Sequence, residues 1–278
     1  MTYNEFKNKM TEDVKKYVNG KYPGYGVDLK QFEKVNRDQV DMIAVTIKDW
    51  REGPAIDVNE LWDDMNQREM NYEEMRREVI QRLNATLDRI SDPIAIDSSD
   101  FKHKIILTLI NAEKNKNMLM NVPHRRFHEF AIVYRYIAKE EIGSMASAIV
   151  TNKLMERYGL TEKELYYSAY ENTKKDAVLD TTFGLVCITT KRRTFGAASI
   201  LFPELLKDIS NNAKSDLYLI PSSSDEWISI PVKEFQGGPE DVNEMIHVAN
   251  SSVVRDEDIL GENCYYYDSK SEEIRIGK

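Results

Sequence analysis

The stretch NVPHRRFHEF, residues 121–130, gathers the side chains that most resemble a chemical site. His124 and His128 are four residues apart, and on one helical turn both imidazoles would lie on the same face, as in zinc-binding helices. The metalloprotease pattern has glutamate directly after the first histidine, whereas here Arg125 and Arg126 follow and would repel a cation. We therefore predict no metal, no cofactor and a basic turn anchored by its aromatic neighbours.

A second interpretation of the same stretch is an anion-binding patch, because guanidinium groups match phosphate and carboxylate oxygens. Another basic run, KRR at 191–193, falls in the same basic third of the chain. The patch predicted on this basis comprises His124, Arg125, Arg126, Lys191, Arg192 and Arg193. The alternative is a pair of solvated basic turns.

Signatures of nucleotide-binding and hydrolytic enzymes are missing from the sequence. Neither G-x-x-x-x-G-K-[ST] nor G-x-G-x-x-G occurs, and GSMAS at 143–147 has Ser147 where a nucleophile elbow needs its last glycine. The cluster PSSSDEW at 221–227 has groups suited to acid–base work, but its composition is also that of a turn. Cys187 lies in the apolar run GLVCITT and is typical of a small buried side chain. No catalytic residue is assigned, and whether the protein is an enzyme stays open.

Composition indicates a globular chain. Its 278 residues are 41% hydrophobic, and no apolar run approaches the roughly 20 residues that a membrane helix needs. The N-terminal stretch alternates acidic and basic residues instead of forming the apolar segment of a signal peptide, and two distant cysteines do not suggest a disulfide framework. We expect a cytoplasmic protein without a membrane partner.

Charge is distributed unevenly along the chain. Residues 1–100 have 15 Lys+Arg against 21 Asp+Glu, residues 101–200 have 16 against 10, and residues 201–278 have 7 against 16. A basic segment usually faces an opposite charge inside or outside the molecule. Residues 234–273 contain 11 acidic residues against two basic ones, so acidic segments of the same chain are the expected counter-charge. We therefore predict that nucleic acid is an unlikely partner and binds weakly at physiological salt.

Hydrophobic periodicity predicts a helix-rich N-terminal part. Apolar residues at steps of four predict a helix over 3–19, and two β-rich runs at 27–36 and 40–49 predict a hairpin. A short helix is expected within 53–67. A longer one follows the cap Asn71, with an apolar stripe of Met75, Val79, Leu83, Leu87 and Ile90.

After residue 100 the sequence pattern changes and predicts alternating strands and helices. Apolar runs predict strands at 102–111, 130–138, 183–191, 216–223 and 226–232, with a last hairpin in 263–276. Helices are predicted over 146–159, 161–173, 203–213 and 239–250. Residues expected to be largely buried are Ile132, Val133, Tyr134, Val186, Ile188, Leu217, Leu219 and Ile228.

These elements predict an α+β fold: a mostly antiparallel sheet with flanking helices and a helix-rich N-terminal part. Residues 1–100 would form an α+β segment of helix, hairpin and helices. Residues 101–278 would form a sheet-centred α+β domain, and whether the first segment packs on it is left open.

Several blocks of the sequence, in their order, resemble a bacterial domain-of-unknown-function family, the one numbered 5688. The blocks are LINAEKNKNMLMNVPHRRFHEFAIVYRYI, ASAIVTNKLMERYGLTEKELYYSAYENT, FGAASILFPELL and DLYLIPSSSDEWISIPV. The resemblance is strongest over residues 100–232, and His128 departs from it, since an apolar residue is expected there. It implies no established activity, and a site that depends on His128 would not be a family trait.

Two functions follow from the sequence. The first is an uncharacterised cytoplasmic bacterial protein, a non-catalytic interaction or regulatory protein that binds an unknown protein or another charged partner. The alternative is an enzyme of unrecognised type that acts on an anionic or phosphate-bearing substrate through His124, Arg125, Arg126 and Glu129. An enzyme requires these side chains to converge in a concave site with a perturbed titrating group, whereas a binding protein does not.

Overall fold

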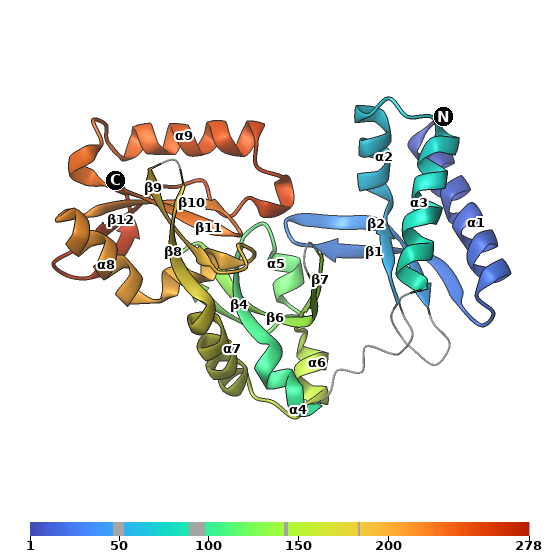
Figure 1. Ribbon diagram of the computed structural model, residues 1–278, viewed down its shortest axis with the longest axis horizontal. Coiled ribbons are helices and arrows are strands. Elements are labelled where there is room, and N and C mark those ends of the chain that lie inside the picture. The colour runs from blue at the N-terminus through green and yellow to red at the C-terminus, as the bar shows by residue number, and fades with distance from the viewer. Residues whose placement is uncertain (47–52, 89–97, 142–143, 183, 278) are drawn as a thin grey trace. The chain divides into compact units, whose positions relative to one another are not determined.

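The structure is a computed structural model that describes residues 1–46, 53–88, 98–141, 144–182 and 184–277 (Figure 1). It divides into two compact units, Met1–Ala95 and Ile96–Lys278. No helix in the described ranges is both long and apolar enough to cross a membrane.

Unit 1, Met1–Ala95, packs three helices with a small antiparallel sheet. Its elements are α1 (Tyr3–Lys21), β1 (Gly26–Lys34), β2 (Arg37–Thr46), β3 (Ala55–Asp57), α2 (Val58–Gln67) and α3 (Tyr72–Leu87). The strands lie in the order β1-β2-β3. The Asn71 side chain accepts from the Glu74 amide and so caps α3, whose predicted stripe from Met75 to Leu87 is buried. Ile90 of that stripe lies outside the described residues.

Unit 2, Ile96–Lys278, contains two antiparallel sheets instead of the single sheet that we predicted. The central strand of the four-stranded sheet is β6 (Phe130–Glu141). It pairs with each of the other three strands, β4 (Ile105–Asn111), β5 (His124–Phe127) and β7 (Ser144–Ile149). The six-stranded sheet has the order β13-β12-β10-β11-β9-β8. Its strands are β8 (Ala177–Thr182), β9 (Leu185–Thr190), β10 (Leu217–Ser223), β11 (Glu226–Pro231), β12 (Tyr265–Asp268) and β13 (Glu273–Ile276).

The main core of unit 2 forms where apolar residues of both sheets meet helix α7 (Glu162–Asp176) and a 3-10 segment, η2 (Gly196–Leu201). Trp227 is fully buried there, its indole Nε1 donates to the Ala197 carbonyl at 3.0 Å, and its ring lies 5.5 Å from those of Phe130 and Tyr265. The helices of this unit are α4 (Ser98–Phe101), α5 (Lys116–Leu119), α6 (Asn152–Arg157), α7 (Glu162–Asp176), α8 (Pro203–Ala213) and α9 (Pro239–Ser252).

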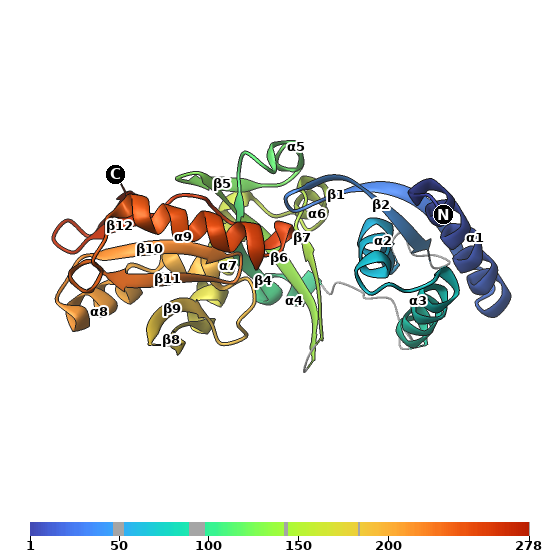
Figure 2. The same ribbon diagram turned by 90° about the horizontal axis from the view of Figure 1, so that it is seen from above.

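A second, smaller core lies under α9. Val242 and Ile246 of this helix pack with Tyr218, Ile230 and Cys264 of the six-stranded sheet and its connections. Figure 2 shows α9 lying along strands β10 and β11. The helix therefore covers one face of that sheet with a single apolar stripe, and the rest of its surface is left for other contacts.

The α+β prediction with antiparallel sheets and several helices is confirmed. The predicted helix over 146–159 is wrong in its first part, because residues up to Ile149 pair with β6 as β7. Strands β5 and β8 were not predicted. Six of the eight residues expected to be buried are buried, whereas Val186 and Ile228 are partly covered.

Gly196 offers a test of how tightly η2 packs. A Cβ there would lie 2.5 Å from the Asp225 carbonyl oxygen and 2.7 Å from the Thr190 nitrogen, both backbone atoms that cannot easily move. We expect Gly196→Ala to lower the free energy of unfolding by about 2 kcal/mol or more. Urea unfolding measures this, with Gly238→Ala as the control.

The control has more room, because a Cβ at Gly238 has its nearest neighbour, Asp241 Oδ2, at 3.9 Å. It should cost at most about 1 kcal/mol, since glycine at the N-cap is favoured over alanine. Equal losses for the two variants would contradict the packing described for η2.

Candidate functional site

The basic run at 124–127 forms strand β5, not a helical turn. It pairs antiparallel with β6, with Arg125 opposite Ile132 and Arg126 opposite Ala131. Side chains alternate along a strand, so His124 and Arg126 share one face while Arg125 turns to the other. Because residues 124–127 form a strand, His124 and His128 do not lie on one face of a helix.

Arg125 is engaged by acidic and aromatic groups of the same unit. Its Nε and Nη2 donate to the two carboxylate oxygens of Glu162 at 2.7 and 3.0 Å, and its guanidinium lies 3.6 Å from the Tyr166 ring centroid. Tyr134 also donates to Glu162. The hydrogen bonds from Arg125 hold the pKa of Glu162 below its usual value, and the carboxylate raises the pKa of Arg125. Arg125 thus joins β5 to α7.

The two histidines are held differently from each other. His124 is exposed, and its Nδ1 lies 2.8 Å from the Val122 carbonyl oxygen. His128 occupies the turn between β5 and β6 with a φ of 52°, and its ring contacts those of Phe127 and Tyr265. His128 is also exposed, and partial desolvation of its ring lowers its pKa. Behind it, Glu129 accepts from Asn263 at 3.0 Å, so this turn is fastened to the C-terminal segment.

The second basic run is also paired within the unit. Arg192 contacts Asp176 at 3.0 Å and Glu140 at 3.3 Å, and Arg193 pairs with Asp180. Lys191 Nζ donates to the Lys175 carbonyl at 2.9 Å. These acidic partners come from the basic third of the chain itself. Elsewhere in that third, Lys114 pairs with Glu262 at 3.4 Å, a partner in the acidic residues 234–273 that the sequence led us to expect.

The two basic runs do not come together. Arg125 pairs across from Ile132, whereas Arg192 contacts Glu140, eight residues further along the same strand β6. At about 3.3 Å per residue this is a separation of roughly 25 Å. The structure therefore does not bring the six residues of the predicted anion-binding patch into one site.

Arg135 is a cation that the sequence analysis did not single out. It lies within β6, where Nη1 donates to Ser147 Oγ at 3.2 Å and the Phe195 ring centroid is 4.2 Å from the guanidinium. Its Nε is buried and has no hydrogen-bond partner among the described residues. Burial alone lowers the pKa of Arg135 to about 10. Arg135 is thus a largely covered cation beside an aromatic ring.

The serine and carboxylate groups at the turn between β10 and β11 make structural hydrogen bonds. Asp225 Oδ1 accepts from the Phe195 amide at 2.7 Å, its carbonyl accepts from Thr189, and Ser224 donates to Asp258 at 3.1 Å. Burial raises the pKa of Asp225. Ser224 and Asp225 thus have structural partners, which agrees with the turn interpretation.

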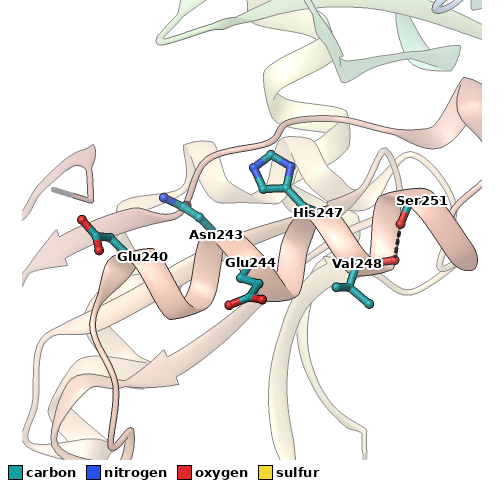
Figure 3. A pocket seen from close by; sticks show the side chains of 6 residues that line it. All are labelled: Glu240, Asn243, Glu244, His247, Val248 and Ser251. Atoms are coloured by element: carbon teal, nitrogen blue, oxygen red, sulfur yellow. Dashed lines mark hydrogen bonds between the residues drawn. The ribbon is translucent and has the colours of Figure 1, made fainter.

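Unlike the two basic runs, helix α9 has exposed apolar side chains on its surface. Figure 3 shows part of this surface from close by. Along one side of the helix, Asp241, Met245, Val248 and Ser252 follow one another at steps of four, three and four residues, and all four are exposed. We call these four residues the α9 seam. Met245 is 50% and Val248 60% exposed, high values for apolar side chains. The seam borders two shallow surface depressions that share Glu244 and Val248.

The opposite side of α9 is fastened to the unit. Asn243 Oδ1 accepts from the Cys264 amide at 2.6 Å, and Asn250 donates to the Gly261 carbonyl at 3.0 Å. Pro239 stands in the first turn, and Asp241 accepts from the Gly238 amide at 2.7 Å. These bonds fix the rotation of the helix and so the direction of the seam.

The sequence contained a signal for the α9 seam that we did not use. The helix PEDVNEMIHVANSS has two apolar stripes, Val242 with Ile246 and Met245 with Val248, where a helix on a sheet needs only one. It also has three acidic residues and no Lys or Arg. Only the structure shows which stripe is buried.

The family model described as "Family of unknown function (DUF5688)" matches residues 3–182 and 175–269. The chain therefore belongs to this family of unknown function, as the order of its sequence blocks indicated. No curated protein and no solved structure matched it.

The Arg125–Glu162 pair predicts a pH-dependent contribution to stability. The pKa of Glu162 is lowered on folding, so the contribution is present above its ordinary value of 4.5 and is lost as the pH falls through the lowered pKa. Because both side chains are about one-third exposed, we expect Glu162→Gln to cost about 1 kcal/mol at pH 7. The cost should shrink at pH 3.

Urea unfolding at the two pH values measures this difference. Glu171→Gln is the control, since it makes the same change at an exposed position of α7 and should stay within about 0.5 kcal/mol. A pH-independent loss in Glu162→Gln would contradict the assigned pair.

The absence of a bound transition metal stays a prediction. No group of three potential ligands gathers among the described residues, and the two histidines of the 121–130 stretch have other contacts. Elemental analysis of the purified protein should find no stoichiometric zinc. About one zinc per chain that is lost in His124→Ala or His128→Ala would show the opposite.

Proposed function

We propose that this protein is a non-catalytic interaction protein that binds a partner protein through the α9 seam. The observation that supports the proposal is a pair of exposed apolar side chains, Met245 and Val248, on a helix whose other side is firmly anchored. Exposed apolar surface with a polar rim is typical of interaction sites. Here the rim is provided by Asp241, Glu244 and Ser252.

The alternative, an enzyme for an anionic substrate, has less support. Of its candidate groups, Arg125 is engaged by Glu162 and Glu129 accepts from Asn263. Arg192 and Arg193 of the second basic run are also paired with carboxylates of the same unit. His124 and Arg126 are exposed on strand β5, and the two basic runs are roughly 25 Å apart by strand register. A catalytic site needs convergent groups that are free to meet a substrate.

The same ion pairs support the proposal that nucleic acid is not the partner. Binding a phosphate backbone relies on free Lys and Arg side chains that displace counterions. Several arginines of the basic third are already neutralised by neighbouring carboxylates. We also propose a cytoplasmic location in a bacterial cell, because two cysteines far apart in the sequence do not suggest the disulfide framework of a small secreted protein.

Site-specific photo-crosslinking in cells that naturally contain the protein tests the proposed function. A photo-crosslinking amino acid at Met245 or at Val248 should give adducts with the same partner protein. The control position is Tyr167 on α7, which is 61% exposed and should give no such adduct. In the Met245 probe, the added change Val248→Ser should reduce the adduct severalfold.

Two results would contradict the proposal. One is no adduct from either seam position. The other is an equal adduct from Tyr167, which would indicate random encounter instead of a binding surface.

A further inference from the structure

The spacing of the α9 seam is that of a helix–helix contact. Asp241, Met245, Val248 and Ser252 are separated by four, three and four residues. Residues at these steps form one line along a helix and meet a second helix in coiled-coil-like packing. From Asp241 to Ser252 the line is about 16 Å long, at 1.5 Å per residue.

Acidic side chains accompany this line at its N-terminal half. Glu240, Asp241 and Glu244 are exposed, and no Lys or Arg lies between Pro239 and Ser252. After the helix, Arg255 pairs with both Glu257 and Asp258, so the acidic residues that follow α9 are partly neutralised there. A partner that lies along the seam thus meets negative charge at the N-terminal half of α9.

We propose, building on the function proposed above, that the partner presents an amphipathic helix to the α9 seam, with apolar side chains facing Met245 and Val248 and with Lys or Arg on its flanks. A short helix with apolar residues at steps of three and four matches the two apolar positions. Basic flanking residues then lie opposite Asp241 and Glu244, where opposite charges favour binding and set the orientation.

Charge disfavours the other occupants of such a surface. A second copy of α9 that runs in the same direction brings acidic residues against acidic residues, and one that runs in the opposite direction offers them no Lys or Arg from the helix. An anionic membrane surface and a nucleic-acid backbone are repelled by the same groups. A basic protein helix is the occupant whose charge and shape both fit.

A defined peptide tests this inference with the full chain. The probe is a fluorescent helical peptide with leucines at steps of four, three and four and lysines on both flanks; the reference peptide has glutamate at every lysine. Fluorescence anisotropy should give a Kd of about 10–100 μM for the lysine peptide, as expected for a small interface. The glutamate peptide should bind at least about tenfold more weakly.

Two variants separate the apolar and the charged parts of the interaction. Val248→Ser should weaken binding about tenfold or more. Glu244→Lys should weaken it about threefold to tenfold, with the effect reduced at 0.5 M salt. Glu171→Lys makes the same charge change on α7 and should leave the Kd unchanged. Because all three positions are exposed, unfolding of the variants is not expected, and circular dichroism checks this.

The outcomes distinguish this inference from the function on which it rests. Equal binding of both peptides, no effect of Glu244→Lys, or no binding of the lysine peptide would overturn the basic-helix partner. Seam-specific crosslinks obtained together with such a result would leave the proposed function standing. If the crosslinks are missing as well, both fail. Binding of phosphatidylserine vesicles, or concentration-dependent dimers lost in Val248→Ser, would assign the seam to the occupants that charge disfavours.

Discussion

The burial of Val242 and Ile246 against the six-stranded sheet is the contact on which the arrangement of α9 depends. These side chains are 0% and 3% exposed, and they pack with Tyr218, Ile220 and Ile230. Burial of two such side chains stabilises the docked helix by roughly 3–6 kcal/mol. Since a helix turns by a fixed angle per residue, burying this stripe necessarily exposes Met245 and Val248.

Charge in unit 2 is mostly balanced locally. Arg125 with Glu162, Arg192 with Asp176 and Arg193 with Asp180 hold β5, α7 and the segment after β9 in register with their neighbours. Among the described residues, these pairs explain why the six residues of the predicted anion-binding patch do not gather at one place. The acidic groups of α9 have no basic residue within their helix, so their field remains directed outward.

The sequence predicted those parts of the fold that depend on local pattern. Apolar runs located β4, β6 and β10, and the capping residues Asn71 and Thr161 located the starts of two helices. Strand β5, HRRF, was missed because its composition is polar and only its pairing with β6 makes it a strand. β7, SMASAI, was taken for helix because its small residues have little strand preference of their own.

The candidate site was harder to predict for the same reason. Arg125 and Glu162 are 37 residues apart, and nothing in either segment indicates that they meet. A basic run read alone therefore suggested a free patch, whereas in the fold Arg125, Arg192 and Arg193 form structural ion pairs. The α9 seam is local in sequence, but which of its two apolar stripes is buried depends on the shape of the sheet beneath it.

Hydrogen exchange of the full chain, with and without the lysine-flanked peptide, tests the central claim most directly. The account predicts added protection concentrated in Pro239–Ser252, because a bound helix shields the α9 seam and slows local opening of this helix. Added protection in His124–Phe127 or in residues 191–193, with α9 unchanged, would contradict it and would return the basic runs to the role of binding site.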